Sequence, residues 1–256
     1  MDPNAFSIGP IHVRWYGMLI ATALLIGIIG GTRQVRKKGI NEDDFMSLLI
    51  VTIICAFIGA RAYYVLFNLP YYLSHPSEII AIWHGGIAIH GAILGGGLAV
   101  WFMCRKYSIP FWQLVDIIAP FLILGQAIGR WGNFFNQEAY GYAVDKSEVP
   151  WAIFIEATGQ YHHPTFLYES IWDILVFFVL IWLGKQAFAK RGEIALSYLV
   201  LYSMGRVFVE GFRTDSLMLG PLRMAQVISI IFMIVGAGFI WYRRKKYGKD
   251  LPSVTE

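Results

Sequence analysis

Seven long apolar segments recur along this chain, and they limit its fold more than any other feature. A bilayer core about 30 Å thick takes about 20 apolar residues as a helix, and fewer where polar side chains face protein or water. Hydrophobic residues make up 57% of the chain and charged residues only 15%, which predicts an all-α polytopic membrane protein with about seven transmembrane helices. The expected spans are residues 16–31, 45–67, 85–103, 111–129, 165–183, 194–209 and 224–241.

The apolar segments follow one another over the whole chain, so we expect residues 1–256 to form a single membrane-embedded domain. The first segment is followed, rather than preceded, by a basic cluster from Arg33 to Lys38. A secretory signal peptide carries its positive charge in front of the apolar run. The first segment is therefore expected to remain in the protein as a transmembrane helix.

Lysine and arginine are unevenly divided between alternate loops, which predicts the orientation of the chain in the membrane. Fourteen of them fall in the loops after the first, third and fifth spans and in the tail, about residues 243–256. The loops on the other side hold only four, which are Arg14, Lys146, Arg213 and Arg223. Because basic loops stay in the cytoplasm, we expect an external N-terminus and a cytoplasmic basic tail.

The longest connection on the external side is about residues 130–164, between the fourth and fifth spans. It contains the helix breakers Gly141, Pro150, Gly159 and Pro164, and its segment 151–155 has the composition of a short strand. We expect this connection to form a small extracytoplasmic head.

An arginine, two asparagines and a glutamate lie close together directly after the uncharged run 117–129. Such polarity beside a membrane span indicates a functional site. Arg130 presents a fork of donors that suits a lipid phosphate, and a helical continuation would place Asn133 and Gln137 on the same face. The alternative is an interfacial arginine whose charge reaches out to water.

The sixth span repeats this pattern with Tyr202, Arg206 and Glu210, which are four residues apart and so share a helical face. Arg206 and Glu210 could form only a structural ion pair. A second arginine at a similar depth to Arg130 instead suggests two positive charges that face one anionic substrate. Two arginines would repel each other unless an anion lay between them.

The third span contains two histidines among many glycines, and histidine can exchange a proton near neutral pH. His84 and His90 are six residues apart and do not share a helical face, so a two-histidine metal site is not expected. Either histidine could be a buried, hydrogen-bonded residue without a catalytic task, and the glycines are explained by close helix packing alone.

Other polar residues give weaker signals. We expect Arg61, Glu169 and Asp173 to satisfy one another across helices. Tyr16 is most simply an aromatic residue at the membrane interface.

The chain resembles the prolipoprotein diacylglyceryl transferase family of bacteria in six motifs, which follow one another in the same order as in the family. The resemblance covers nearly the whole chain from about residue 8. The most specific is Gly129-Arg-Trp-Gly-Asn-Phe-Phe-Asn-Gln-Glu138, which is similar to the family signature. The others are Arg14-Trp-Tyr-Gly17, Gly59-Ala-Arg61, His84-Gly-Gly-Ile-Ala-Ile-His-Gly91, His163-Pro-Thr-Phe-Leu-Tyr-Glu169 and Gly205-Arg206 with Glu210. Trp131 and the pair Thr165-Phe166 depart from the residues that are frequent in the family.

The resemblance implies an enzyme of the bacterial cytoplasmic membrane with its active site towards the outer face. Its substrates would be phosphatidylglycerol and the lipobox cysteine in the signal peptide of a preprolipoprotein, and it would need no cofactor, metal or nucleic acid. The implied catalytic residues are His90, Arg130 and Arg206. The implied substrate-binding residues are Tyr16, Asn133, Glu138, Gly141, Tyr202 and Glu210.

The polar residues suit this reaction. A cysteine thiol with a pKa of about 8.5 needs a base or a positive field to become a good nucleophile, and His90 is the candidate base. Buried arginines would also suit a transporter or flippase for an anionic lipid, although such proteins often show internal repeats. An intramembrane hydrolase is a weaker alternative because no serine lies in a nucleophile-elbow motif.

Overall fold

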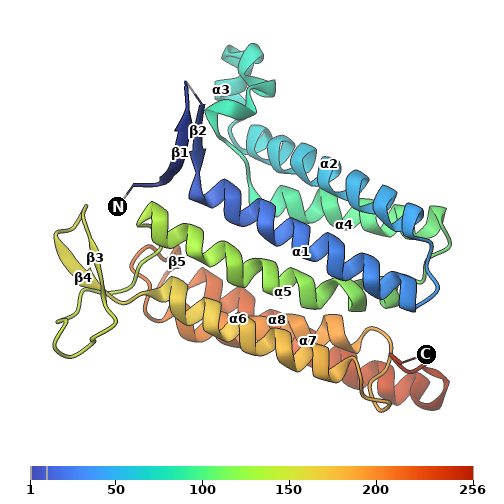
Figure 1. Cartoon of the computed structure of the whole chain (residues 1–256). Helices are drawn as coiled ribbons and strands as arrows, with labels where there is room; N and C mark the ends of the chain where they lie inside the picture. Colours follow the sequence, from blue (N-terminus) through green and yellow to red (C-terminus); the bar gives the residue numbers. More distant parts are fainter. Residues whose placement is uncertain (1, 10, 256) are drawn as a thin grey trace. The chain divides into compact units, whose positions relative to one another are not determined.

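The computed structural model describes residues 2–9 and 11–255, which divide into two compact units. Unit 1 comprises Met1–Gly31 and Val115–Glu256, and unit 2 comprises Thr32–Leu114. Both units are mostly helical, as the sequence predicts. Figure 1 shows the course of the chain through them.

Each of the seven predicted spans corresponds to one long helix. These helices are α1 (Trp15–Lys37), α2 (Glu42–Phe67), α4 (Ile89–Lys106), α5 (Phe111–Asn136), α6 (Thr165–Leu183), α7 (Glu193–Glu210) and α8 (Met224–Tyr247). Helix α4 begins four residues later than predicted, because Gly85 and Gly86 have φ angles of 87° and 78°, outside the helical region.

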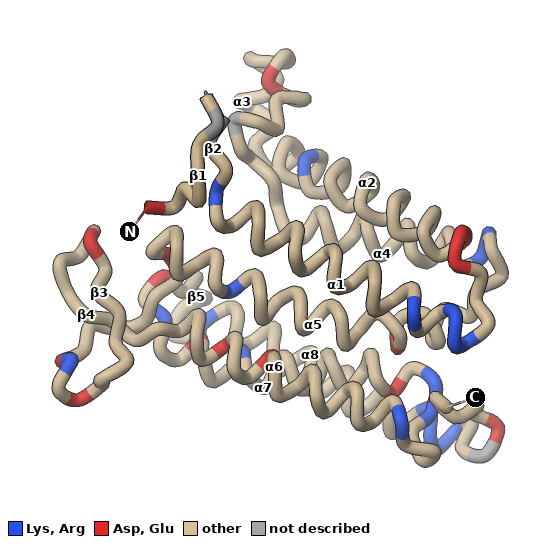
Figure 2. The backbone as a smooth tube through the Cα atoms, in the orientation of Figure 1, with Lys and Arg blue, Asp and Glu red and all other residues tan. Residues whose placement is uncertain are grey.

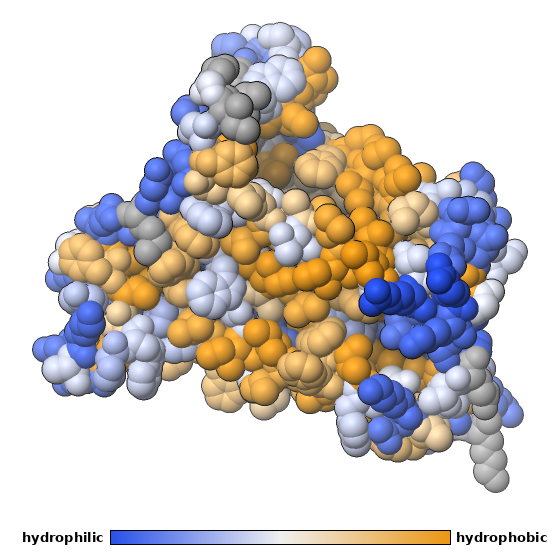
Figure 3. All heavy atoms as spheres, viewed as in Figure 1, coloured by the Kyte–Doolittle hydropathy of each residue, from blue (hydrophilic) through white to orange (hydrophobic). Residues whose placement is uncertain are grey.

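Within the described residues, five of these helices are long and apolar enough to cross a membrane, namely α1, α2, α5, α6 and α8. Charged residues gather near the helix ends in Figure 2, and hydrophobic side chains cover much of the helical surface in Figure 3. This is the pattern of helices that expose apolar side chains to lipid. The structure therefore supports a multi-pass membrane protein, and the count of seven spans stays a prediction.

In unit 2, helices α2 and α4 lie side by side with their backbones in contact (Figure 1). A Cβ atom on Gly91 would overlap the carbonyl oxygen of Gly59, and one on Gly95 would overlap that of Cys55. Gly97, in contrast, faces open space. The glycines at 91 and 95 thus serve close helix packing. The segment between the two helices consists of α3 (Leu69–Ser74) and the 3₁₀ turns η1 (Pro76–Ile80) and η2 (Ile82–His84).

In unit 1, α7 contacts both α6 and α8. The Trp172 indole fills the space beside Gly205, and its Nε1 donates to the Leu201 carbonyl at 2.8 Å. The carboxylate of Asp116, on α5, accepts hydrogen bonds from the backbone amides of Gly192 and Ala195 at the start of α7. These contacts hold α5, α6 and α7 in a fixed arrangement.

The tail after α8 folds back onto unit 1 through the turn η3 (Gly248–Asp250). The Val254 amide donates to the Ala189 carbonyl at 2.9 Å, and the Val254 side chain is buried in a core with Leu180 and Ile194. Arg244 donates two hydrogen bonds of 2.6 Å to Glu193 at the start of α7. Part of the predicted basic tail is therefore packed against the helices.

The described residues of unit 1 form three short antiparallel hairpins, one before α1 and two in the connections between helices. They are β1 (Asn4–Ile8) with β2 (Ile11–Arg14), β3 (Ile153–Ile155) with β4 (Gln160–His162), and β5 (Met218–Leu219) with β6 (Leu222–Arg223). Strand β3 confirms the strand that the sequence predicts at 151–155, whereas the N-terminal hairpin was not predicted. Helix α5 continues to Asn136, so Arg130 lies inside a helix and the irregular connection begins only at Gln137.

Candidate active site

A single carboxylate joins the two arginines that the sequence singles out. The Nη2 atom of Arg130, on α5, donates to Oε1 of Glu169, and Nη1 of Arg206, on α7, donates to Oε2 of the same side chain at 3.1 Å. Glu169 lies in the first turns of α6 and is only 3% exposed. Its negative charge allows the two guanidinium groups to occupy one buried site without repelling each other.

The network continues from α7 into the loop that follows it. Arg206 pairs with Glu210 at 2.7 Å, and Arg213 lies 3.9 Å from the same carboxylate. Arg213 also donates two hydrogen bonds to Asp215, at 2.8 and 2.7 Å, and these bonds lower the pKa of the Asp215 carboxyl. The three arginines Arg130, Arg206 and Arg213 are therefore matched by three carboxylates.

The arginines reach the surface more than the carboxylates that hold them. Their side chains are 22% exposed for Arg130, 16% for Arg206 and 14% for Arg213, against 3% for Glu169 and Glu210. The carboxylates thus lie behind the guanidinium groups and fix their positions. Donors on the open side remain for an incoming anion.

Two further side chains lie beside this network. Tyr202 lies one turn before Arg206, and its ring stacks on that of Tyr198 with 5.9 Å between the ring centroids. It lies close enough to Arg130 to interact with its charge. Asp173, one turn after Glu169, is fully buried, and neither of its oxygens has a hydrogen-bond partner in the described part of the chain.

The expectation that Arg61, Glu169 and Asp173 satisfy one another is wrong. The carboxylate of Glu169 binds Arg130 and Arg206. The guanidinium of Arg61, in unit 2, donates instead to backbone carbonyls of its own unit. A buried arginine can be satisfied by neutral carbonyls, which the sequence pattern did not reveal.

The end of α5 places Asn133 and Glu138 together. The Asn133 amide donates to Glu138 Oε1 at 2.9 Å, and Asn136 donates to the same atom at 3.1 Å. Glu138 therefore binds side-chain amides, whereas Glu210 binds an arginine. Gln137 was expected on the face of Arg130, but it lies past the helix end with a φ of 51° and binds the Glu156 amide at 2.9 Å.

Gly141 acts through its backbone. Its amide donates to the His163 carbonyl at 2.9 Å, and it forms an isolated bridge with Arg213. A Cβ atom at this position would lie 2.7 Å from Cβ of His163 and 3.0 Å from the Phe212 carbonyl. Gly141 therefore lets the connection after α5 pack against the loop that carries Arg213.

Tyr16 lies in the first turn of α1, and its ring covers Gly132 so closely that a Cβ atom there would overlap it. Gly132 is two residues after Arg130, so unit 1 brings Tyr16 to the same end of α5. The Tyr16 side chain is 42% exposed. The neighbouring Trp15 stacks on Phe135 at 4.8 Å and secures this contact.

His90 belongs to unit 2, in the first turn of α4, and its exposed side chain stacks on Tyr63 at 5.7 Å. His90 is therefore the one predicted site residue outside unit 1. The other eight of the nine lie in unit 1, on or near α1, α5 and α7. Glu169 and Arg213 were not among those predicted. The signal for Glu169 was a carboxylate within an apolar span, and Arg213 was counted only as a loop charge.

No group of three or more histidine, cysteine, aspartate or glutamate side chains in residues 2–9 and 11–255 has an arrangement that could hold a metal ion. The site described above presents fixed arginines, amides and hydroxyls. Such groups bind a phosphate and stabilise negative charge that develops on it.

Comparison with known proteins agrees with this chemistry. The family described as prolipoprotein diacylglyceryl transferase matches residues 3–242 of the chain. The chain belongs to the prolipoprotein diacylglyceryl transferase family. Two curated relatives are named phosphatidylglycerol–prolipoprotein diacylglyceryl transferase. One, from Trichormus variabilis, is 50% identical over 99% of this chain and 93% of its own, and one, from Staphylococcus aureus, is 46% identical over the same shares.

A third relative with that name, from Synechococcus elongatus, is 47% identical over 99% of this chain and 91% of its own. As a prolipoprotein diacylglyceryl transferase, the chain carries the buried Arg130–Glu169–Arg206 bridge inside the region that matches the family.

Proposed function

We propose that this protein transfers the diacylglyceryl group of phosphatidylglycerol to the lipobox cysteine thiol of a preprolipoprotein. The name of its relatives, phosphatidylglycerol–prolipoprotein diacylglyceryl transferase, supports the lipid donor and the class of protein acceptor. The products are a thioether-linked lipoprotein precursor and glycerol phosphate. The observation that carries the proposal is the arginine pair held by Glu169, because it offers fixed positive charge to a phosphate at the end of apolar helices.

The arginines act on the leaving group. As the thiolate attacks the glycerol carbon that bears the phosphoester, the carbon–oxygen bond breaks and the phosphate gains negative charge. Arg130 and Arg206 stabilise that charge with donors whose positions are fixed, which are more effective in a partly buried site than in open water. Glu169 and Glu210 hold the guanidinium groups in place, so little reorganisation is needed during the reaction.

Asn133 and Tyr202 supply hydrogen bonds to the lipid, and Glu138 orients the Asn133 amide. Tyr16 and Gly141 shape the same end of the site. His90 takes the thiol proton, which leaves the sulfur as the nucleophile. The phosphate changes from a diester with one negative charge to a monoester with two as the thiol loses its proton, so atoms and charge balance.

In the membrane, we propose that all seven long helices span the bilayer of a bacterial cell, with the N-terminus outside. The connection after α5 then forms an extracytoplasmic head, and the basic residues after α8 lie in the cytoplasm. This orientation follows from the fourteen-to-four division of lysine and arginine between the two sides. It puts the arginine site at the face where exported preproteins emerge.

The test is a reaction of purified protein with phosphatidylglycerol and a lipobox peptide, followed by mass spectrometry of the peptide. We expect a diacylglyceryl adduct on cysteine and none on a cysteine-to-serine peptide. Arg130→Ala and Arg206→Ala should abolish the adduct, whereas Lys146→Ala, on the exposed connection, should not. Full activity in both arginine variants would refute the roles assigned to them.

A further inference from the structure

A second layer of polar side chains lies one helical turn deeper in unit 1 than the arginine network. Each of its members is four residues from a member or neighbour of that network, and they are Gln126 on α5, Asp173 on α6 and Tyr198 on α7. The Tyr198 hydroxyl donates to Oε1 of Gln126 at 3.2 Å and so joins α7 to α5. The next turn of α5 and α6 contributes the core residues Ile123 and Val176. The second layer therefore separates the arginines from the apolar core.

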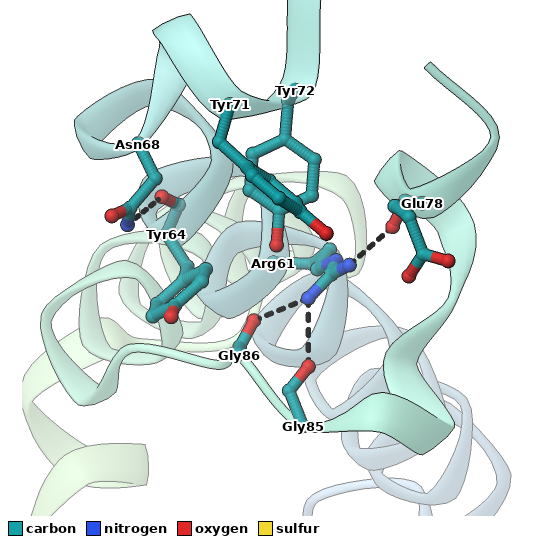
Figure 4. Close-up of a pocket in the computed structure, with 8 residues that line it drawn as sticks. All are labelled: Arg61, Tyr64, Asn68, Tyr71, Tyr72, Glu78, Gly85 and Gly86. Carbon is teal, nitrogen blue, oxygen red and sulfur yellow. Dashed lines mark hydrogen bonds between the residues drawn. The ribbon is translucent and has the colours of Figure 1, made fainter. Parts of the chain in front are cut away.

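Asp173 differs from the other buried acids of the described residues, because no residue binds its carboxyl group. Asp116 accepts hydrogen bonds from two backbone amides, and the buried Arg61 of unit 2 is satisfied by the carbonyls of Gly85 and Gly86 (Figure 4). Asp173, in contrast, is 0% exposed, and neither of its oxygens has a partner in the part of the chain that the structure describes. Burying an ionised carboxylate without a donor costs far more free energy than burying the neutral acid.

The charged and titratable groups around Asp173 come from three helices. They are Glu169 on α6, Arg130 on α5, and Tyr198, Tyr202 and Arg206 on α7. The Glu169 charge disfavours a second negative charge nearby, whereas the two arginines favour one. Both arginines already bind Glu169, so their charges are matched without Asp173. Burial and the Glu169 carboxylate therefore stabilise the protonated form of Asp173.

The protonation state of Asp173 sets the net charge of the site. The three arginines of the network are matched by the three carboxylates that hold them. With a neutral Asp173 the network has no net charge, and its outward guanidinium donors can bind a phosphate. With an ionised Asp173 the network carries one negative charge, which opposes the negative charge of the phosphate.

We propose that Asp173 is a positioning residue that couples the binding of phosphatidylglycerol to the uptake of one proton. The lipid binds when Asp173 is neutral, and an ionised Asp173 takes up a proton from solvent as the lipid binds. No covalent bond of the lipid changes in this step. Asp173 is buried behind the arginines, so it acts through the charge of their site and does not touch the lipid. The inference rests on the proposed function, since it takes the arginine site as the place where the lipid phosphate binds.

The test measures the binding of short-chain phosphatidylglycerol to the full-length protein in detergent, by isothermal titration calorimetry and without any peptide. The range is about pH 6 to about pH 9, in which fully buried carboxyl groups ionise. The wild-type affinity should be constant at the acid end and fall about tenfold towards the alkaline end. That is the effect of one like charge about two helical turns away at an effective dielectric constant of about 20. Buffers of different ionisation enthalpy should report proton uptake on binding at the alkaline end.

Asp173→Asn keeps the shape of the side chain and cannot ionise. This variant should bind the lipid with the same affinity at every pH of the range and take up no proton. Asp145→Asn, on the exposed connection after α5, is the matched control and should follow the wild type.

The proposal is overturned if the wild-type affinity is independent of pH, or if Asp173→Asn keeps the wild-type fall. A loss of affinity in Asp173→Asn that is equal at every pH would also overturn it, because that result shows only a structural role. The peptide-adduct reaction on the same preparation tests the proposed function separately. An adduct with pH-independent binding would retain the function and remove this inference, whereas proton-linked binding without an adduct would do the reverse.

Discussion

The substitution Glu169→Gln removes the charge that bridges two helices and keeps the shape of the side chain. Arg206 retains Glu210 at 2.7 Å, so the loss falls on Arg130, for which Glu169 is the ion-pair partner in the described structure. Removing one partner of a buried ion pair costs about 3–5 kcal/mol. Because the Arg130 side chain is 22% exposed and so partly solvated, we expect a cost at the lower end of this range, about 3 kcal/mol.

For a protein of this size, 1 kcal/mol shifts the melting temperature by about 2–4 °C, so Glu169→Gln should melt roughly 10 °C below the wild type. The measurement is thermal unfolding of the purified protein in detergent, followed by the loss of monodisperse protein. Glu210→Gln should cost less, because Arg206 keeps Glu169 and Arg213 keeps Asp215. Glu148→Gln, on the exposed connection, is the control and should melt as the wild type does.

The reasoning is refuted if Glu169→Gln melts within about 2 °C of the wild type, because a loss of only about 1 kcal/mol in the free energy of unfolding would already lower the melting temperature by about that much. It is also refuted if Glu210→Gln is the more damaging change. A double replacement, Arg130→Met with Glu169→Leu, should recover stability but not activity, because well-packed apolar residues can replace a buried ion pair.

Three further perturbations test other parts of the structure. Gly95→Ala should force α2 and α4 apart and lower the melting temperature by several degrees, whereas Gly97→Ala, which faces open space, should keep or raise it. Arg213 lowers the pKa of Asp215, so this pair's stabilisation is complete above the unfolded-state pKa and is lost as pH falls through the lower folded-state pKa. The hydrogen-exchange protection factors of residues 211–217, taken relative to the intrinsic exchange rate at each pH, should therefore fall on acidification below about pH 4, and Asp215→Asn should show low protection factors at neutral pH as well. Val254→Asp places a charge in the core beside Leu180 and should destabilise the protein by about 3 kcal/mol in thermal unfolding, whereas Thr255→Asp, on the exposed neighbour, should not.

Most of the helical fold could be predicted from the sequence because apolar composition and length decide it locally. The predicted bounds of α6 agree with the structure, and the other long helices contain or nearly contain their predicted spans. The start of α4 could not be placed, since composition does not show that Gly85 and Gly86 adopt positive φ. The hairpin of β1 and β2 was missed because it precedes the first apolar run and has no strong turn signal.

In the site, too, contacts between residues close in sequence could be predicted, whereas contacts between distant residues could not. Arg206 and Glu210 are one turn apart on α7, so their pairing follows from helical spacing. The bridge from Glu169 to Arg130 joins residues 39 positions apart, and only the packing of α5 against α6 creates it. The sequence indicated that an anion should lie between the two arginines, but it could not indicate that a glutamate of the chain supplies it.

The glycines of this protein contact two kinds of neighbour, and their evolution should differ accordingly. Gly86, Gly132 and Gly205 lie against the side chains of Arg61 or Tyr64, Tyr16 and Trp172, and a larger residue at the glycine could be accommodated by a smaller partner. These positions should covary with their neighbours among homologous sequences. Gly91 and Gly95 lie against the carbonyl oxygens of Gly59 and Cys55, and no substitution makes a carbonyl smaller. Selection can therefore only keep those two glycines, and co-evolution methods should detect no signal at this contact between α2 and α4.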